Sequence, residues 1–325
     1  MISVKNLTKI YKTPIRSSNF IKDIFFRKYK EKVALNNVSF EIGSNELVGF
    51  IGPNGAGKTT TLKILAGILY PTKGEVRVLG NNPFDKRPEF LRQIAFVMGQ
   101  RNQLIWELPA LDSFQLNKEI YSVSDKNFKQ TVDELTTLLN CQKLIDRPVK
   151  TLSVGERMKM ELIAALIHRP RLIFFDEPTI GLDIFSQEAI REFIKKFQQQ
   201  YGSSIILTSH YLEDVKRLAK RLIVVNQGKI LYDGALKKII DQYSKVKYVS
   251  IVLEKNVRDD LVNRIGKPLV NLYPKIVWAI QKNVLPEKIT LINKLIPYSD
   301  LTVEEERIEE IIKTLFKKKV ERYGR

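Results

Sequence analysis

One nine-residue segment limits the fold of this 325-residue chain more than any other part of the sequence. It reads Gly52-Pro53-Asn54-Gly55-Ala56-Gly57-Lys58-Thr59-Thr60 and fits the pattern GxxxxGK[ST]. An apolar run at 46–51 precedes it, and an amphipathic helical pattern at 61–69 follows it. This strand, loop and helix order predicts an α/β core in which the segment 52–60, the phosphate loop, binds a phosphate group.

Each part of the phosphate loop has a chemical role in that setting. Gly55 and Gly57 let the backbone curl, so that its N–H groups and the following helix N-terminus point at one anion. Lys58 is expected to neutralise phosphate oxygens, and Thr59 to supply a hydroxyl to Mg²⁺. The alternative, a glycine-rich turn before an ordinary helix, is disfavoured by the complete pattern. The predicted nucleotide-binding residues here are Gly52, Asn54, Gly55, Gly57, Lys58, Thr59 and Thr60.

A second apolar strand pattern ends in two adjacent carboxylates, Asp176 and Glu177. The run at 171–175 is apolar on both faces, which is typical of an interior strand, and ligands bind where such strands end. Successive side chains of a strand point to opposite faces, so the two carboxylates should have different tasks. We expect Asp176 to hold hydrated Mg²⁺ and Glu177 to orient and polarise the attacking water. Alone, these residues would indicate only a strand exit followed by a helix cap.

A third segment, Leu152-Ser153-Val154-Gly155-Glu156-Arg157, resembles the LSGGQ signature of ABC-type ATPases. The resemblance covers about the first 240 residues, and further motifs follow in the family's order. Gln100 matches the Q-loop, residues 181–183 match the D-loop, His210 matches the switch histidine, and Tyr11 matches the aromatic residue that stacks on adenine.

This resemblance implies that two cassettes pack head to tail, with each ATP held between the phosphate loop of one and the signature of the other. Ser153, Gly155 and Glu156 at the start of a helix would then meet the γ-phosphate from the far side. His210 would sense the γ-phosphate, and Asp183 would couple the two sites across the interface. Gln100 would join the metal ligands Thr59 and Asp176 and act beside Glu177 and His210 in catalysis.

Two signature positions depart from the family's pattern. Val154 stands in place of the first signature glycine, and Glu156 replaces the usual glutamine. Gly155, which must approach phosphate closely, is retained. We therefore expect hydrolysis to be preserved, with an altered rate.

Charge and composition exclude several other classes. The chain has 54 Lys and Arg against 36 Asp and Glu, a formal charge of +18, with 44% hydrophobic and 28% charged residues. Every apolar run is interrupted by charge before it reaches the roughly 18 residues of a membrane span. Residues 1–12 lack the apolar core of a secretory signal, and the single cysteine, Cys141, cannot form an intrachain disulfide. We expect a cytoplasmic protein.

The expected fold is a P-loop NTPase of ABC type with a β-rich N-terminal part and a helical subdomain, followed by a small α+β domain. Residues 1–240 form the predicted cassette, with a basic insert at 12–32 and the helical subdomain at about 100–165. Residues 241–325 form the predicted accessory domain. Strand patterns at 246–254, 275–281 and 299–305 and helical patterns at 257–265, 286–295 and 303–316 indicate a ferredoxin-like βαββαβ order with a final helix.

Two segments have open interpretations. In the insert, apolar residues at helical spacing lie among lysines and arginines. This pattern predicts either a basic helix at the anionic inner membrane surface or against a partner's cytoplasmic helix, or a solvated loop whose aromatic residues pack on the cassette's own sheet. These apolar residues are Phe20, Ile21, Ile24 and Phe25. The accessory domain is interpreted as regulatory or dimer-stabilising, or as extra packing surface.

The single cassette, the basic insert after Tyr11, the signature at 152–157 and the extra C-terminal domain together resemble the ATPase subunits of ABC-2-type exporters. This resemblance implies an ATP-binding and ATP-hydrolysing subunit of such an exporter at the cytoplasmic face of the membrane, using ATP and Mg²⁺. Its expected partners are separately encoded permease subunits and a second copy of the cassette. Apolar residues after Gln100 form either a groove for a partner helix or internal core: Trp106, Leu108, Pro109 and Leu111. The competing class is a soluble ABC ATPase acting on nucleic acid or ribosomes, which we rank lower because no nucleic-acid-binding motif is recognisable.

Overall fold

A computed structural model describes residues 1–15, 28–99, 102–209, 211–306 and 308–323. The chain divides into two compact units, an N-terminal unit at Met1–Gly234 and a C-terminal unit at Ala235–Arg325. This division falls six residues before the boundary that the change of pattern after residue 240 had indicated.

The N-terminal unit is built on a six-stranded sheet with the strand order β5-β6-β7-β3-β8-β9. The pairs from β5 to β8 are parallel. The strands are β3 (Leu47–Ile51), β5 (Ile94–Met98), β6 (Leu172–Asp176), β7 (Ser204–Thr208), β8 (Arg221–Asn226) and β9 (Lys229–Ala235). A second, antiparallel sheet has the order β2-β1-β4, with β1 at Ile2–Ile15, β2 at Lys28–Ile42 and β4 at Lys73–Val78.

Both faces of the large sheet are buried, because successive side chains along its strands point alternately into two hydrophobic cores. In β6, Leu172 and Phe174 pack into a core shared with the small sheet and α2 (Lys58–Leu65). Ile173 and Phe175 pack into the other core, to which the helices at 110–120, 125–138, 154–166 and 184–201 contribute. This burial on two sides explains the continuous apolar run of β6, and the β5 and β7 neighbours confirm that it is an interior strand.

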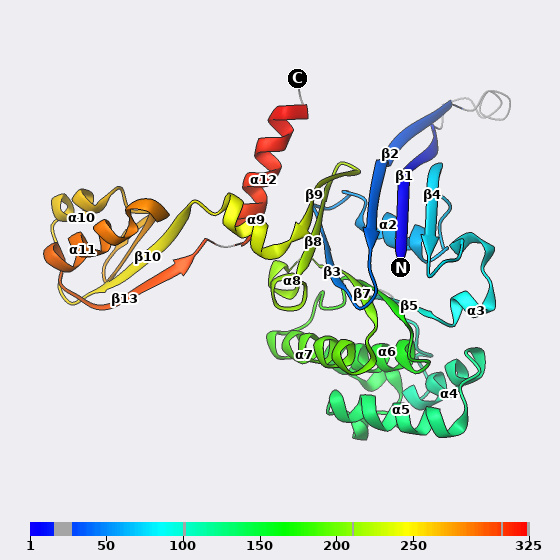
Figure 1. Ribbon diagram of the computed structural model, residues 1–325. Coiled ribbons are helices and arrows are strands. Elements are labelled where there is room, and N and C mark those ends of the chain that lie inside the picture. Colours follow the sequence, from blue (N-terminus) through cyan, green and yellow to red (C-terminus); the bar gives the residue numbers. More distant parts are fainter. Residues whose placement is uncertain (16–27, 100–101, 210, 307, 324–325) are drawn as a thin grey trace. The chain divides into compact units, whose positions relative to one another are not determined.

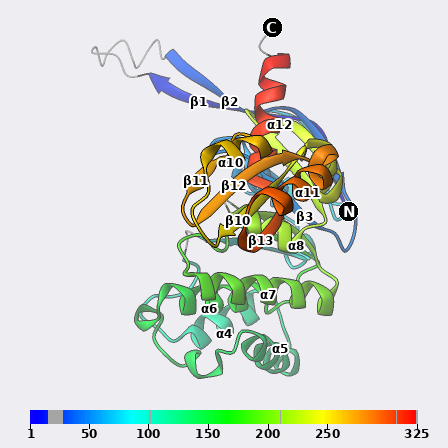
Figure 2. The same cartoon turned by 90° about the vertical axis from the view of Figure 1, so that its left-hand side faces the viewer.

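The helical subdomain lies on one side of the large sheet. Figures 1 and 2 both show α4, α5 and α6 gathered next to α7. These helices are α4 (Ala110–Ile120), α5 (Asp125–Leu138), α6 (Val154–Leu166) and α7 (Ile184–Tyr201); α3 (Pro88–Leu91) and α8 (Leu212–Leu218) are shorter. Ser153 is the N-cap of α6, and Gly155 and Glu156 lie in its first turn, so the signature is at the start of a helix.

The basic insert begins and ends as strand. The β1–β2 pairing continues to Ile15 and Lys28, so residues 12–15 and 28–32 of the insert belong to the small sheet. Backbone pairing in the hairpin overrides the polar character of these residues. The central part, with Phe20, Ile21, Ile24 and Phe25, lies outside the described residues.

The C-terminal unit contains the predicted βαββαβ order. Its four-stranded sheet has the order β11-β12-β10-β13, which is ferredoxin-like. The elements are α9 (Leu236–Tyr243), β10 (Val246–Leu253), α10 (Asp259–Ile265), β11 (Val270–Leu272), β12 (Lys275–Gln281), α11 (Leu285–Leu295), β13 (Tyr298–Glu305) and α12 (Ile308–Tyr323). The final helix, predicted from Val303, begins at Ile308 because Val303–Glu305 pair with β10.

A partly buried histidine, His168, makes the stability of the N-terminal unit depend on pH. The His168 ring stacks on Tyr121 with centroids 3.8 Å apart, and its Nε2 lies 3.0 Å from the carbonyl oxygen of Ile94. Burial lowers the pKa of His168 from its ordinary 6.5 to about 4. The folded protein therefore binds fewer protons than the unfolded chain between these values, so stability falls as pH drops below about 6.5.

We expect this histidine to lower the free energy of unfolding by about 2 kcal/mol between pH 7 and pH 5. Urea unfolding at the two pH values measures the loss. The His168→Gln variant, which does not titrate, should lack this part of the pH dependence. An equal loss in the variant would show that other groups are responsible.

Candidate active site

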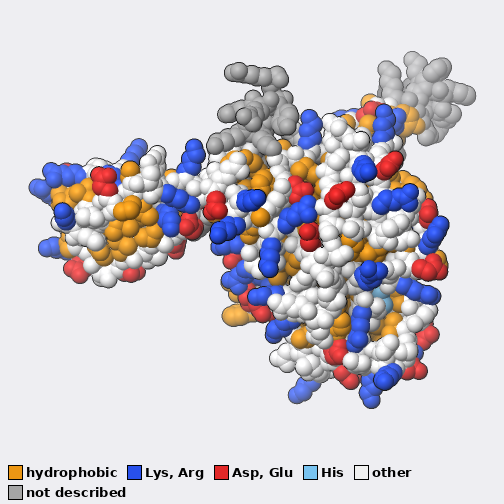
Figure 3. Space-filling model, in the orientation of Figure 1, with side chains coloured by type: hydrophobic (Ala, Val, Ile, Leu, Met, Phe, Trp, Pro, Cys, Tyr) orange, Lys and Arg blue, Asp and Glu red, His pale blue; other side chains and the backbone are white. Residues whose placement is uncertain are grey.

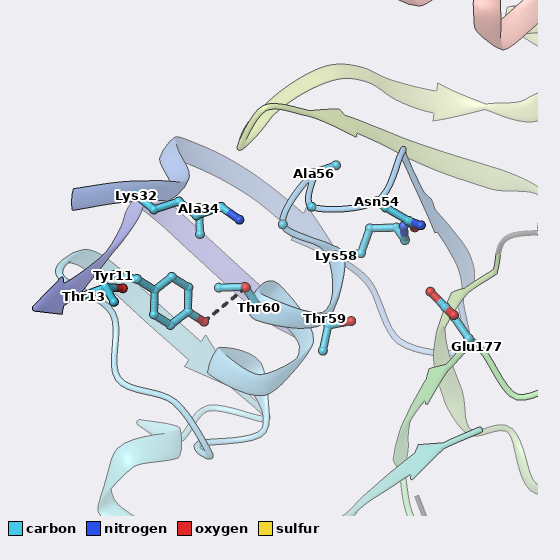
Figure 4. Close-up of a pocket in the computed structure, with 12 residues that line it drawn as sticks. Tyr11, Thr13, Lys32, Ala34, Asn54, Ala56, Lys58, Thr59, Thr60 and Glu177 are labelled. Carbon is cyan, nitrogen blue, oxygen red and sulfur yellow. Dashed lines mark hydrogen bonds between the residues drawn. The ribbon is translucent and has the colours of Figure 1, made fainter. Parts of the chain in front are cut away.

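The phosphate loop forms one wall of a hollow of about 510 Å³ in the N-terminal unit. Figure 4 shows the β1–β2 hairpin on one side of the loop and Glu177 on the other. The lining residues are Tyr11, Thr13, Lys32, Ala34, Asn54, Gly55, Ala56, Gly57, Lys58, Thr59, Thr60 and Glu177. A volume of this size suits a nucleotide-sized ligand.

Glycines give the phosphate loop a shape that other residues would not adopt. Gly55 and Gly57 have φ angles of 77° and 109°, in the left-handed region. A Cβ at Gly57 would also lie 2.7 Å from the carbonyl oxygen of Ala34. Gly57 caps α2, so the loop leads its backbone N–H groups into the helix N-terminus. This is the anion-binding geometry that the sequence predicts.

Lys58 is buried inside the loop. Its Nζ donates hydrogen bonds to the carbonyl oxygens of Gly52 at 2.8 Å and Pro53 at 3.3 Å. Burial lowers the pKa of the Lys58 ammonium, while the negative charges of Glu177 and Asp176 act in the opposite direction. The cation therefore lies beside the two carboxylates, at the place where phosphate oxygens would enter.

Thr59 and Asp176 bring two oxygen ligands together beside the loop. The Thr59 Oγ1 donates to the Asp176 Oδ1 at 3.1 Å, and Thr208 Oγ1 donates to the same oxygen at 2.7 Å. Mg²⁺ is usually held by one or two protein oxygens together with water and substrate phosphates, so this pair fits a magnesium site. No group of three or more His, Cys, Asp or Glu that could hold a metal occurs in the described parts of the chain.

Glu177 leaves β6 through a turn. Its φ is 58°, an uncommon value for a residue with a side chain, and its N–H lies 3.1 Å from both the carbonyl oxygen and Oγ1 of Thr208. The prediction separated Asp176 from Glu177 by strand alternation; in the structure this left-handed turn directs the Glu177 carboxylate toward the hollow (Figure 4).

The hairpin supplies the wall opposite Glu177. The Tyr11 hydroxyl lies 3.3 Å from Thr60 Oγ1, drawn as the dashed line in Figure 4. Tyr11 pairs with Lys32 across the hairpin, so both side chains share a face with Thr13. Thr13 and Lys32 were not predicted, since their place follows from the register of two strands. Only the pairing of 9–15 with 28–35 could have indicated them.

Ser153 and Glu156 cap α6, the helix that begins within the signature. The Glu156 Oε2 accepts from Ser153 N at 2.9 Å, and Ser153 Oγ accepts from Glu156 N at 3.2 Å. The hydrogen bond from the Ser153 backbone lowers the pKa of Glu156. Glu156, which replaces the family's usual glutamine, thus completes a capping box with Ser153. Because the Ser153 hydroxyl accepts this hydrogen bond, its own proton is available for donation to an oxyanion.

Gly155 lies against the start of α7. A Cβ at Gly155 would be 2.3 Å from the Ser186 Oγ. The same hydroxyl donates to Asp183 at 2.6 Å, and Asp183 caps α7 by accepting from the N–H groups of Phe185 and Ser186. These hydrogen bonds lower the pKa of Asp183. Ser186, which sequence reasoning missed, therefore joins the signature to the D-loop within one chain.

The predicted residues thus fall into two groups. Residues 54–60 of the phosphate loop, Tyr11 and Glu177 line one hollow, and Asp176 adjoins it through its hydrogen bond with Thr59. The second group comprises the signature and D-loop residues Ser153, Gly155, Glu156 and Asp183. None of these four residues lines the hollow, so this group lies apart from it. Gln100 and His210 lie outside the described residues.

A parallel sheet that carries a phosphate loop, a Thr59–Asp176 pair and Glu177 at its carboxyl edge defines a P-loop ATPase. Residues 35–180 match the family model described as ABC transporter. The chain is 32% identical over 234 residues to the ABC transporter ATP-binding protein NatA of Bacillus subtilis (strain 168), a match covering 72% of this chain and 95% of that relative.

Two further comparisons agree. The chain is 31% identical to the Nod factor export ATP-binding protein I of Rhizobium sp. (strain N33), covering 69% of this chain and 73% of that relative. The dimeric post-hydrolysis structure of the ATP-binding cassette MJ0796, bound to ADP and Pi, matches with a TM-score of 0.61 at 25% identity, covering 73% of this chain and 99% of that one. The chain belongs to the ABC transporter family, as an ATP-binding subunit.

Proposed function

We propose that the protein hydrolyses ATP as a homodimer and drives an ABC-2-type exporter from the cytoplasmic face of the membrane. One observation supports the proposed homodimer. The hollow of one chain contains the phosphate loop and Glu177, while Ser153 and Gly155 lie elsewhere on the same chain. A second copy would supply these two residues to the γ-phosphate, and nucleotide-dependent closure of the dimer would follow from this requirement. The dimeric state of the MJ0796 cassette supports this arrangement.

In this proposal each residue of the hollow has one task. Lys58 and the loop N–H groups bind the phosphates, Thr60 lies beside them, and Tyr11 stacks on adenine. Thr59 and Asp176, with Gln100, would hold Mg²⁺, which neutralises charge on the phosphates when bound. Glu177 orients and polarises the attacking water. Gln100 and His210 take their roles at the γ-phosphate from the family resemblance.

The direction of transport rests on the relatives. One of them is named for export of Nod factors, which supports an exporter. No helix in the described parts of the chain is long and apolar enough to cross a membrane. We therefore assign the membrane path to separately encoded permease subunits.

The segment after the Q-loop offers a surface for such a partner. Trp106 and Leu108 are 41% and 42% exposed, whereas Leu111 packs against the core, so the groove interpretation suits the first two and the core interpretation suits the third. Lys150 N donates to the Trp106 carbonyl at 3.0 Å, and Val149 N donates to the Leu108 carbonyl at 3.0 Å. A partner on this surface would therefore press on the segment that leads to the signature.

We expect Trp106→Glu to abolish stimulation of ATP hydrolysis by the permease while basal hydrolysis is unchanged, because a charge is introduced on the partner surface and not in the hollow. ATPase rates with and without the reconstituted permease measure the effect. Ile68→Glu, which also places a charge at an exposed apolar residue of the N-terminal unit, is the matched control. Loss of folding in Trp106→Glu would favour the core interpretation for this residue.

Contact with the anionic inner membrane surface through the insert is part of the proposal, although the insert's central residues lie outside the described chain. Nucleic acid is not a proposed partner. Figure 3 shows Lys and Arg side chains spread over the visible face of both units among acidic and apolar residues, with no continuous basic stripe.

The proposed function is tested by purifying tagged Glu177→Gln protein from its native membranes in detergent with ATP present. The expected co-purifying component is a polytopic membrane protein. Recovery of only ribosomes or nucleic acid would contradict the transporter proposal.

A further inference from the structure

A buried ion pair lies behind the candidate active site. Asp214 on α8 is fully buried, and Arg191 on α7 is 6% exposed. Asp214 Oδ1 accepts from Arg191 Nε at 2.6 Å. Asp214 Oδ2 accepts from two hydroxyls, those of Thr179 and Ser209, each at 2.5 Å. Charge-assisted hydrogen bonds this short are the strong class.

The three partners of Asp214 come from three different segments of the N-terminal unit. Thr179 lies two residues after Glu177. Ser209 directly follows β7. Arg191 belongs to α7, the helix that Asp183 caps. The carboxylate therefore joins the segment after the catalytic glutamate, the end of the neighbouring strand and the D-loop helix.

The two residues at the end of β7 hold the Glu177 turn from both sides. On the near side, Thr208 accepts from the Glu177 N–H and donates to Asp176. On the far side, Ser209 and Thr179 meet at Asp214. Glu177 itself has a φ of 58°, a conformation that persists only where the surrounding structure enforces it.

Arg191 keeps Asp214 in place. Its Nη1 donates to Glu188 Oε2 at 3.0 Å, and its Nη2 donates to Gln187 Oε1 at 2.9 Å. These three nitrogens of the guanidinium thus donate to acceptors on two helices, α7 and α8. The Asp214 carboxylate cannot move toward or away from Thr179 without breaking this arrangement.

We propose that Asp214 is a positioning residue for ATP hydrolysis: through Thr179 it holds the Glu177 turn so that the Glu177 carboxylate faces the phosphate. Asp214 is not itself a catalytic residue, because it does not line the hollow. The inference rests on the proposed role of Glu177 as the residue that polarises water.

The test compares two variants that differ in one hydroxyl. Thr179→Val removes the hydrogen bond to Asp214, and we expect kcat to fall about 10-fold or more with KM for ATP within about twofold, since one hydrogen bond to a charged group is lost. Thr179→Ser keeps the hydroxyl and should restore kcat to near the wild-type value. Thr131→Val is the matched control, because Thr131 is a buried threonine whose hydroxyl has no partner among the described residues.

A second measurement separates positioning from a structural effect. In a Glu177→Gln background the turn has no carboxylate to place, so adding Thr179→Val should cause no further loss of the residual turnover. If Thr179→Val fails to fold, Thr179→Ala, which also lacks the hydroxyl but is smaller than threonine, should show the same two results while the Arg191–Asp214 pair is kept.

Two outcomes would overturn the inference: an unchanged kcat in Thr179→Val, or losses that multiply in the double variant. If Glu177→Gln alone leaves turnover unchanged, the proposed role of Glu177 is wrong. That result is distinguishable from an inactive Glu177→Gln combined with a fully active Thr179→Val.

Discussion

Glu177→Gln is expected to lower the turnover number for ATP by at least about 100-fold, within the range that positioned general acid–base groups contribute. Glutamine keeps the size of the side chain and can still contact water, but it cannot take up a proton. The phosphate loop, which binds the nucleotide, is untouched. ATP affinity should therefore stay close to that of the unmodified protein.

Steady-state release of phosphate measures the turnover, and fluorescent nucleotide titration measures the affinity. Glu75→Gln is a suitable control, because Glu75 is an exposed glutamate of β4 that does not line the hollow. Both the turnover and the affinity of this control should match the unmodified protein. Full activity in Glu177→Gln would disprove the assignment of Glu177.

The parts of the site that the sequence predicts well are those in which one short segment contains both the backbone geometry and the chemistry. Gly55, Gly57 and Lys58 belong to one loop, in which the two glycines have positive φ angles and Lys58 donates to the carbonyl oxygen of Gly52. Asp176 and Glu177 follow from an apolar strand with carboxylates at its end. Neither prediction needs knowledge of which strands pair.

The residues that sequence reasoning missed depend on long-range pairing. Lys32 reaches the hollow because it is opposite Tyr11 in a hairpin. Thr208 and Asp214 meet their partners across 31 to 35 positions of sequence, through strand order and helix packing. A lone threonine or aspartate carries no local signal of such contacts.

The final helix shows the same limit at the level of secondary structure. Residues 303–305 fit a helical pattern as well as a strand pattern, and pairing with β10 decides for the strand. Intrinsic preference is a weak guide where a neighbouring strand offers a ladder of hydrogen bonds. Tertiary context moves the helix start to Ile308.

Arg191→Met is expected to lower the free energy of unfolding of the N-terminal unit by about 3 to 5 kcal/mol, because it leaves the Asp214 charge buried without its cation. Methionine fills much of the arginine's volume, so the loss reports the charge more than a cavity. The two remaining donors to Asp214 are hydroxyls, those of Thr179 and Ser209, which satisfy hydrogen bonds but supply no positive charge.

Urea unfolding, followed by tryptophan fluorescence and by circular dichroism, measures this loss. The control is Arg217→Met on α8, where the arginine is about half exposed and pairs with Glu188 at 2.6 Å and Glu213 at 3.0 Å. Exposed ion pairs are screened by water and salt, so this second substitution should change stability far less than the first. Equal effects of the two substitutions would mean that burial of the Arg191–Asp214 pair does not determine its contribution to stability. That result would also contradict the view that this pair anchors Thr179.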